Sequence, residues 1–495
     1  MKVIIGIAVL LLVFLALQFW NPRIDQPPVT GRLQAPPEVA AILNRACADC
    51  HSNVNRLHWY DKIAPASWLV NGDIREARSR YNLSTWDSLK PADQQGELWE
   101  MVNMIINGKM PLGIYTAIHR NARVSPREIE VLKAYLASLD RYKPGDTALV
   151  AAGDREFAEY VLRMGGDSAG KPGATGLGAA GLAAAGLGAT GLAAGRRSHA
   201  GLAAADGVHY IDGFSDWQVI STTNRFDNHS IRIVFANALV VKAIRDGRVR
   251  SFPDGSVIVK AVWNSIEDGN GHVSPGTVNS IQLMVKDEKR FPETEGWGFA
   301  KFNGVALMPY GATAAFNTTC FNCHKMASDF GYVFNIPPTR ELFDAGELRV
   351  ITSFADNRQQ TLSTLYGNEA ARRAAVSAGH VTGGGAPGGG GVGMLRGDSV
   401  GMAGGDGGSM PRGDGGEASG ASYTLVTWKQ IKNTFWYGSQ INGPLLSVER
   451  VTLSPASKVV YEVLKGAVPA DSTGHVPDRQ SRLALIVGRR ASVLS

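Results

Sequence analysis

The pattern of hydrophobic and polar positions divides the chain into a helical first part and a strand-rich second part. In the first part, apolar residues recur at the spacing of a helix face in three segments, 37–46, 95–106 and 126–139. The aromatic-rich segment 59–68 separates the first two and is interpreted as a loop. This pattern predicts a small all-α module over about residues 35–142.

In the second part, Val, Ile and aromatic residues form short runs separated by turn signals such as Asp254-Gly255. They predict one helix at 237–245 and five strands, at 217–222, 230–235, 256–263, 278–285 and 297–302. We therefore expect a β-rich α+β module over about residues 206–335, and a multidomain chain as a whole.

Two stretches follow neither period, and many of the 58 glycines lie in them. In residues 165–205, Gly-Leu recurs every five residues, which matches neither helix nor strand and predicts a linker; a packed solenoid is the alternative. Residues 379–420 contain too few apolar side chains to fold alone and predict a disordered surface insertion.

The N-terminus carries an apolar run from Val3 to Trp20, behind Lys2. The run is long enough to span a bilayer, and no small-x-small cleavage site follows it. We interpret residues 1–20 as an uncleaved membrane anchor, with a cleaved signal peptide as the alternative. Either version predicts an exported protein, and the anchor predicts a periplasmic one held at the inner membrane. The net charge of +6 is modest and predicts no nucleic-acid partner.

The chemistry is concentrated in the four cysteines, which all lie in two Cys-x-x-Cys-His motifs, 47–51 and 320–324. This spacing attaches c-type haem, because the two thiols form thioethers and the histidine binds the iron. A zinc site shared by the two cysteine pairs is the alternative, but a histidine directly after each pair favours haem. The sequence thus predicts two covalently bound haems, with Cys47, Cys50, Cys320 and Cys323 attaching them and His51 and His324 as iron ligands.

Met110, followed by Pro111, comes just after the second predicted helix, on a loop that could present its thioether to the first iron. A core methionine is the alternative interpretation, and His119 is the reserve ligand. For the second iron we expect no sixth protein ligand, since Met308 only superficially repeats the Met-Pro pattern. An open iron of this kind can bind substrate or gas, and Phe226 either lines that open side or belongs to the core.

The first module resembles the haem-binding domain of membrane-anchored bacterial cytochromes c. The resemblance covers about residues 35–142 and rests on the first haem motif, on Trp59-Tyr60 and Pro65-x-Ser67-Trp68, and on Asn82-Leu-Ser-x-Trp86, Gly108-Lys-Met110-Pro111 and Tyr115. It implies His51 and Met110 as axial ligands and electron transfer as the role.

The second module is similar to the cytochrome P-460 family over about 120 residues. The residues that carry the resemblance are Asp216-Trp217, Phe226-Asp-Asn228, Phe252-Pro-Asp-Gly255, Lys260-x-x-Trp263, Gly296-Trp-Gly-Phe299, Pro309-Tyr-Gly311 and the second haem motif. The resemblance implies a β-rich periplasmic haem protein that oxidises hydroxylamine or handles nitric oxide, with a lysine joined covalently to the porphyrin. The related cytochromes c′-β lack that crosslink and bind gases.

Strand alternation singles out Lys260 as that lysine. It shares a face with Ile258 and Val262, and desolvation there lowers the pKa of an ammonium and favours the neutral, nucleophilic amine. The alternative is a lysine whose stem is buried and whose head reaches water, and Lys242 on the predicted helix is the fallback.

The last third repeats the second module at a constant offset of 131 residues, from Arg349 onward. Once the Gly-rich insertion at 379–420 is discounted, Trp428 aligns approximately with Trp263, which puts Leu425 where Lys260 stands, and no haem motif follows. We predict a haemless repeat over about residues 336–465, which includes the Gly-rich insertion. The tail, 466–495, has no readable motif.

These features predict a dihaem protein whose second haem centre, with Lys260 as catalytic residue, oxidises a small, hydroxylamine-like nitrogen compound. The N-terminal haem would relay electrons to an electron-transfer partner. Two alternatives stay open: a protein that binds or senses NO or CO without turnover, and a plain electron-transfer dihaem cytochrome.

Overall fold

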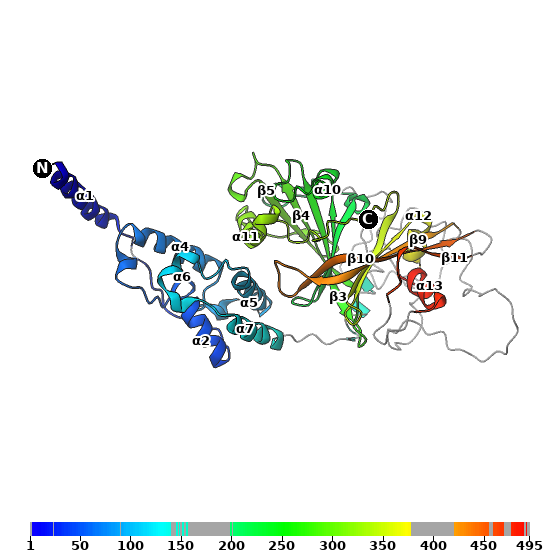
Figure 1. Ribbon diagram of the computed structural model, residues 1–495, viewed down its shortest axis with the longest axis horizontal. Coiled ribbons are helices and arrows are strands. Elements are labelled where there is room, and N and C mark those ends of the chain that lie inside the picture. The colour runs from blue at the N-terminus through cyan, green and yellow to red at the C-terminus, as the bar shows by residue number, and fades with distance from the viewer. Residues whose placement is uncertain are drawn as a thin grey trace, which may run out of the picture. The chain divides into compact units, whose positions relative to one another are not determined.

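The computed structural model describes residues 2–22, 24–89, 91–139, 145–146, 148, 151–152, 155–156, 199, 201–377, 420–454, 459–469, 477–489 and 492. Nearly all of the predicted linker and of the Gly-rich insertion lies outside these residues. The chain forms two units, Met1–Arg141 and Tyr142–Ser495, which are described separately (Figure 1).

The first unit begins with helix α1, Lys2–Leu17, which continues into a short 3-10 helix, Gln18–Trp20. Over the 18 residues from Val3 to Trp20 the mean hydropathy is 2.8, and none of this window is buried in the protein. By length and composition the segment can cross a membrane, and it is compatible with a signal sequence or an anchor.

The rest of the first unit is a small helical module. Its helices are α2 (Pro37–Ala46), α3 (Ala48–His51), α4 (Ala66–Arg80), α5 (Pro91–Ile106), α6 (Gly113–Ile118) and α7 (Pro126–Ser138). The predicted N-terminus of α7 is confirmed, since Ser125 and Glu128 form a complete capping box and Pro126 follows the cap. Helices α5 and α7 pack on one another through stripes that include Leu98, Val102, Leu132 and Leu136.

Helix α4 corrects the sequence interpretation, because residues from Ala66 onward are helical where we expected a loop. Its buried face carries Ser67 and Asn71 beside Ile74 and Ala77. Polar residues on the buried face hide the hydrophobic period, so the pattern gave no helix signal.

The second unit contains one eleven-stranded antiparallel sheet in the part of the chain that the structure describes. Its strands are β1 (Gln218–Arg225), β2 (Ser230–Ala236), β3 (Val257–Glu267), β4 (His272–Lys286), β5 (Trp297–Asn303), β6 (Met308–Pro309), β7 (Arg349–Asp356), β8 (Thr361–Gly367), β9 (Ser422–Lys432), β10 (Ser439–Leu453) and β11 (Val459–Gly466). Its helices are α10 (Ala238–Arg245), α11 (Ala315–His324), α12 (Glu369–Ser377) and α13 (Arg479–Val487). All five predicted strands and the helix at 237–245 are present.

The sheet closes on itself. Its order is β3-β2-β1-β10-β9-β8-β7-β4, and β3 also pairs with β4, so these strands form a ring. The first half of the ring joins the second through β1 with β10 and through β4 with β7. The result is a β-barrel built from both halves of the unit, because closure pairs the two free edges of each half.

The barrel has an apolar interior and a covered outer face. The interior core takes alternate residues from both halves, among them Ile233, Trp263, Ile281 and Trp428. A second cluster lies on the outer face of the first half, where Val234, Ile258, Met284 and Phe299 pack with residues of α10 and α11. Since α11 ends in the haem motif, this outer face positions the second site.

Apart from the two-residue strand β6, which only the first half contains among the described residues, the second half runs through the same succession of elements, β7-β8-α12-β9-β10-β11-α13, as β1-β2-α10-β3-β4-β5-α11 in the first. Figure 1 shows α12 and α13 beside the yellow and orange strands of this half. Leu425 lies in its outer cluster, and Trp428, like Trp263, lies in the barrel interior. The strand content fits the predicted haemless repeat.

Where the first half carries Gln282 opposite Lys260, the second carries Glu449 opposite Leu425. Glu449 is completely buried and pairs with Arg482 of α13, whose Nε donates to its Oε2 over 2.8 Å. Helix α13 belongs to the tail in which the sequence showed no motif, and it covers the outer face of its half as α11 does in the first.

Candidate haem sites

The first haem motif lies at the junction of two helices. The N–H of Cys47 donates to the carbonyl of Leu43 at the end of α2, and the N–H of His51 donates to the carbonyl of Cys47 within the next turn. Cys47 lies between the two helices, and Cys50 and His51 lie in the short helix α3 that follows it. This is the local geometry that the predicted thioether and iron bonds require.

His51 is buried, with 6% of its surface exposed, and its ring stacks on Tyr81 at a centroid distance of 4.1 Å. Burial is the main cause that lowers the pKa of His51 to about 4. The imidazole is therefore neutral at physiological pH, which is the form that binds iron.

Met110 lies half-buried on a bend directly after α5, and its N–H donates to the carbonyl of Met104 over 3.1 Å. The next helix ties this segment to the motif, because the hydroxyl of Tyr115 donates to Oδ2 of Asp49 over 2.7 Å, and Asp49 lies between Cys47 and Cys50. Met110 as axial ligand stays a prediction.

The reserve ligand His119 lies in an aromatic stack. Its ring lies 4.4 Å from Tyr115 and 5.0 Å from His58, and His58 stacks on Tyr60. The sequence interpretation did not single out His58, because an isolated histidine in a loop has no spacing signal.

The second motif forms the end of α11, which Phe321 anchors in the outer cluster of the barrel. Nδ1 of His324 lies 2.7 Å from the carbonyl oxygen of Tyr332, so that nitrogen donates and Nε2 is left for a metal. The imidazole packs between Phe299, at 4.9 Å, and Phe334, at 4.7 Å. Burial lowers the pKa of His324 to about 3, which keeps this ring neutral as well.

Lys260 lies on the outer face of β3, opposite Val234 of β2 and Gln282 of β4. Although part of its surface is accessible, burial is the main cause that holds its pKa well below the ordinary value, and Arg232 and Arg225 add to the effect. Ile258, two residues earlier on the same face of β3, packs in the outer cluster with Phe321 and Cys320 of α11, so Lys260 lies on the face of the sheet that carries the second motif. The strand alternation predicted from sequence is confirmed, and the role of Lys260 stays a prediction.

Arg232 is the most informative neighbour of Lys260. It is 8% exposed, its Nε donates to Ser230, and no carboxylate forms an ion pair with it among the described residues. Burial lowers its pKa to about 9, and Arg225 adds to that shift. Arg232 is a buried cation and Arg225 a largely buried one, and Asp227 pairs with Arg225. A ligand with carboxylates could supply the missing negative charge, and haem carries two such groups, its propionates.

Three other candidate residues are exposed. Lys242 is exposed on α10, where its Nζ pairs with Asp246 over 2.9 Å, so the fallback lysine faces solvent. Met308 is 63% exposed on the short strand β6. Phe226 is 39% exposed, and its ring contacts Tyr437 of the second half at 5.7 Å.

The residues that sequence reasoning missed lie in the turn between β9 and β10, residues 433–438. Phe435 and Trp436 of this turn contact Phe334, which contacts His324. A run of three aromatic residues in an otherwise polar turn was the available signal.

Comparison with family models agrees with both sites. A haem-binding domain model matches residues 8–138, and a cytochrome P460 model matches residues 211–335. No curated protein matches the chain. Each match contains one Cys-x-x-Cys-His motif at the place described above. The chain is therefore a fusion of a haem-binding domain with a cytochrome P460 domain.

Proposed function

We propose that the protein is a dihaem oxidoreductase whose P460 centre oxidises hydroxylamine or a similarly small nitrogen compound. Cys320 and Cys323 would hold the second haem by thioether bonds, with His324 on its iron, and Cys47, Cys50 and His51 would hold the first. Bound haem supplies one-electron redox chemistry and an iron position open to a small ligand.

The observation that supports the proposal is the position of Lys260 on the outer face of β3, the face against which α11 packs. Burial holds the pKa of this amine well below its ordinary value, which favours the neutral form, and a neutral amine can attack an oxidised porphyrin edge. Arg232 and Arg225 supply positive charge on the same side of the sheet, which favours the carboxylates of the porphyrin. This combination supports a modified, catalytic haem over a simple electron carrier.

The N-terminal unit supports the second part of the proposal, electron relay. A small helical haem module with a neutral, buried histidine is suited to electron transfer, and Met110 would raise its reduction potential. The apolar segment from Val3 to Trp20 would hold the protein at the inner membrane, with both units in the periplasm.

Hydroxylamine-dependent reduction of an added one-electron acceptor by the full-length haem-loaded protein tests this function. We expect turnover in the wild type, its loss in Lys260→Met, and wild-type rates in the control Lys242→Met, because Lys242 faces solvent. No acceptor reduction by a wild type that carries both haems would refute the proposal. A reversible CO adduct without turnover would instead assign the protein to the gas-binding class.

A further inference from the structure

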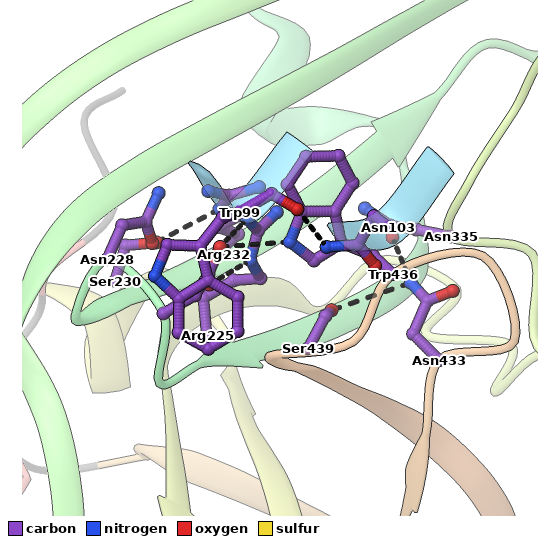
Figure 2. A network of polar contacts seen from close by, with 11 residues as sticks. Trp99, Asn103, Arg225, Asn228, Ser230, Arg232, Asn335, Asn433, Trp436 and Ser439 are labelled. Carbon is purple, nitrogen blue, oxygen red and sulfur yellow. Dashed lines mark hydrogen bonds and ion pairs between the residues drawn. The ribbon is translucent and has the colours of Figure 1, made fainter. Parts of the chain in front are cut away.

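The turn between β9 and β10 belongs to the haemless half of the barrel and packs against the half that carries the second haem motif (Figure 2). Nδ2 of Asn433 donates to Oδ1 of Asn335 over 3.1 Å, and both side chains are buried. The ring of Phe435 contacts Phe330 at 5.1 Å. Asn335 and Phe330 lie in the segment that follows the haem motif, so the turn packs directly on that segment.

Trp436 makes the most specific contacts of the turn. Its Nε1–H donates to Oδ2 of Asp227 over 2.9 Å. The guanidinium of Arg225 lies over the indole ring, 4.6 Å from its centroid, and forms an ion pair with Asp227. Asp227 is 4% exposed, so Trp436 and Arg225 supply hydrogen bonds that its carboxylate cannot obtain from water.

A line of aromatic contacts leads from Trp436 to the predicted iron ligand. The indole meets Phe334 edge-on at 6.1 Å, and Phe334 meets the imidazole of His324 edge-on at 4.7 Å. Phe334 therefore contacts both rings, and the contact with Trp436 restricts the position of Phe334 against the imidazole.

A second line of contacts leads from Trp436 to Lys260. Arg225 and Arg232 are the two cations that lower the pKa of Lys260 after burial. Since Trp436 and Asp227 hold the guanidinium of Arg225, the turn also fixes the position of one positive charge near that amine.

We propose that Trp436 is a positioning residue of the P460 haem site, supplied by the half of the barrel that has no haem motif of its own. It fixes the axial imidazole through Phe334 and the local charge through Asp227 and Arg225. The haemless repeat thereby contributes a residue to the haem site. The inference rests on the proposed haem attachment at Cys320 and Cys323, and it does not depend on which substrate is oxidised.

The test compares Trp436→Leu and Trp436→Phe with the control Tyr461→Phe in the full-length haem-loaded protein. Like Trp436, Tyr461 donates a hydrogen bond to a buried carboxylate. Its acceptor is Glu449, which pairs with Arg482 in the outer cluster of the second half. The readouts are the iron–histidine stretching band in the resonance Raman spectrum of the ferrous protein and the CO dissociation rate.

We expect Trp436→Leu to shift the iron–histidine band and to change the CO dissociation rate by about tenfold, the lower end of the change in affinity or activity that follows loss of an outer-shell partner of a metal ligand. Trp436→Phe keeps a ring against Phe334 and should shift the band less, and Tyr461→Phe should not shift it. A wild-type band and CO rate in Trp436→Leu would overturn the inference.

If Trp436→Leu does not fold, Asp227→Asn tests the contacts that lead to Lys260, because it removes the negative charge and one of the two acceptor oxygens with little change in shape. We expect a higher midpoint potential of the P460 haem, since a nearby cation loses its counter-charge; an unchanged potential would contradict the inference. A shifted band without hydroxylamine turnover would keep the inference while refuting the proposed function. A wild type without haem at Cys320 and Cys323 would refute both.

Discussion

Oγ1 of Thr222 lies 3.4 Å from Oγ of Ser353, and the two residues are separated by the same 131 positions as the sequence repeat. Both hydroxyls also bond to Oγ1 of Thr364, over 3.0 and 2.9 Å. A residue that touches its own counterpart marks the point where a two-fold relation between the halves passes through the barrel. The buried hydroxyls thus connect the two halves at their centre.

We predict that Thr222→Val destabilises the second unit by roughly 1–3 kcal/mol, because it leaves the buried hydroxyls of Ser353 and Thr364 with fewer partners. The matched control is Thr452→Val, a half-buried strand threonine of β10. Guanidinium unfolding of the two variants measures the difference. Equal stabilities would show that the hydroxyl cluster does not stabilise the contact between the halves.

The Glu449–Arg482 pair predicts a larger effect. Arg482→Leu leaves a fully buried carboxylate without its cation and should cost roughly 3–5 kcal/mol. The double variant Glu449→Leu/Arg482→Leu should recover most of that loss, since no charge then remains. Thermal unfolding of both variants checks this, and a double variant no more stable than the single one would contradict it.

Glu97 predicts a pH dependence for the first unit. Burial is the main cause that raises the pKa of Glu97 to about 7, and Glu100 adds to the shift. The folded state therefore prefers the protonated acid, so stability is greatest below the ordinary pKa of 4.5 and falls as the pH rises to about 7.

Glu97→Gln should accordingly raise the melting temperature of the first unit at pH 8 and change it little at pH 4. Glu130→Gln is the control, because Glu130 is exposed and forms only a surface pair with Lys133. Circular dichroism at the two pH values measures the shift. A stabilisation equal at both pH values would argue against titration of Glu97.

The axial ligand of the first haem has its own test. We expect Met110→Ala to abolish the methionine-to-iron absorption band and to lower the reduction potential of that haem. Met104→Ala is the control, because this methionine lies six positions earlier on α5 and meets Met110 through its backbone carbonyl. An unchanged spectrum in Met110→Ala, with a change from a low-spin to a high-spin spectrum in His119→Ala, would transfer the role to His119.

Local patterns in the sequence predicted the local features of the structure. Helix α7 follows from its capping box and stripe, and strand β3 from its alternation, which also placed Lys260 on the outer face. The haem motifs needed no tertiary information, because all their residues lie within one helical turn. Helix α4 was not predicted, because the polar residues Ser67 and Asn71 on its buried face interrupt the hydrophobic period.

Barrel closure and the role of Trp436 could not be read from the sequence. Closure depends on pairs such as Thr223 with Ile441 and Val273 with Ala355, which are distant along the chain. Trp436 lies 112 positions after His324, and only the fold brings both into contact with Phe334. Contacts of this kind carry no periodic signal.

The central claim is that Lys260 lies where it can modify the second haem, and the full-length protein tests it directly. The measurement is the reduced optical spectrum of wild type and Lys260→Met, with mass analysis of the haem peptides after proteolysis. We predict a Soret component far to the red of ordinary haem c and a haem peptide linked to Lys260, both lost in the variant. Ordinary haem c spectra in both proteins, without a lysine-linked peptide, would contradict the account.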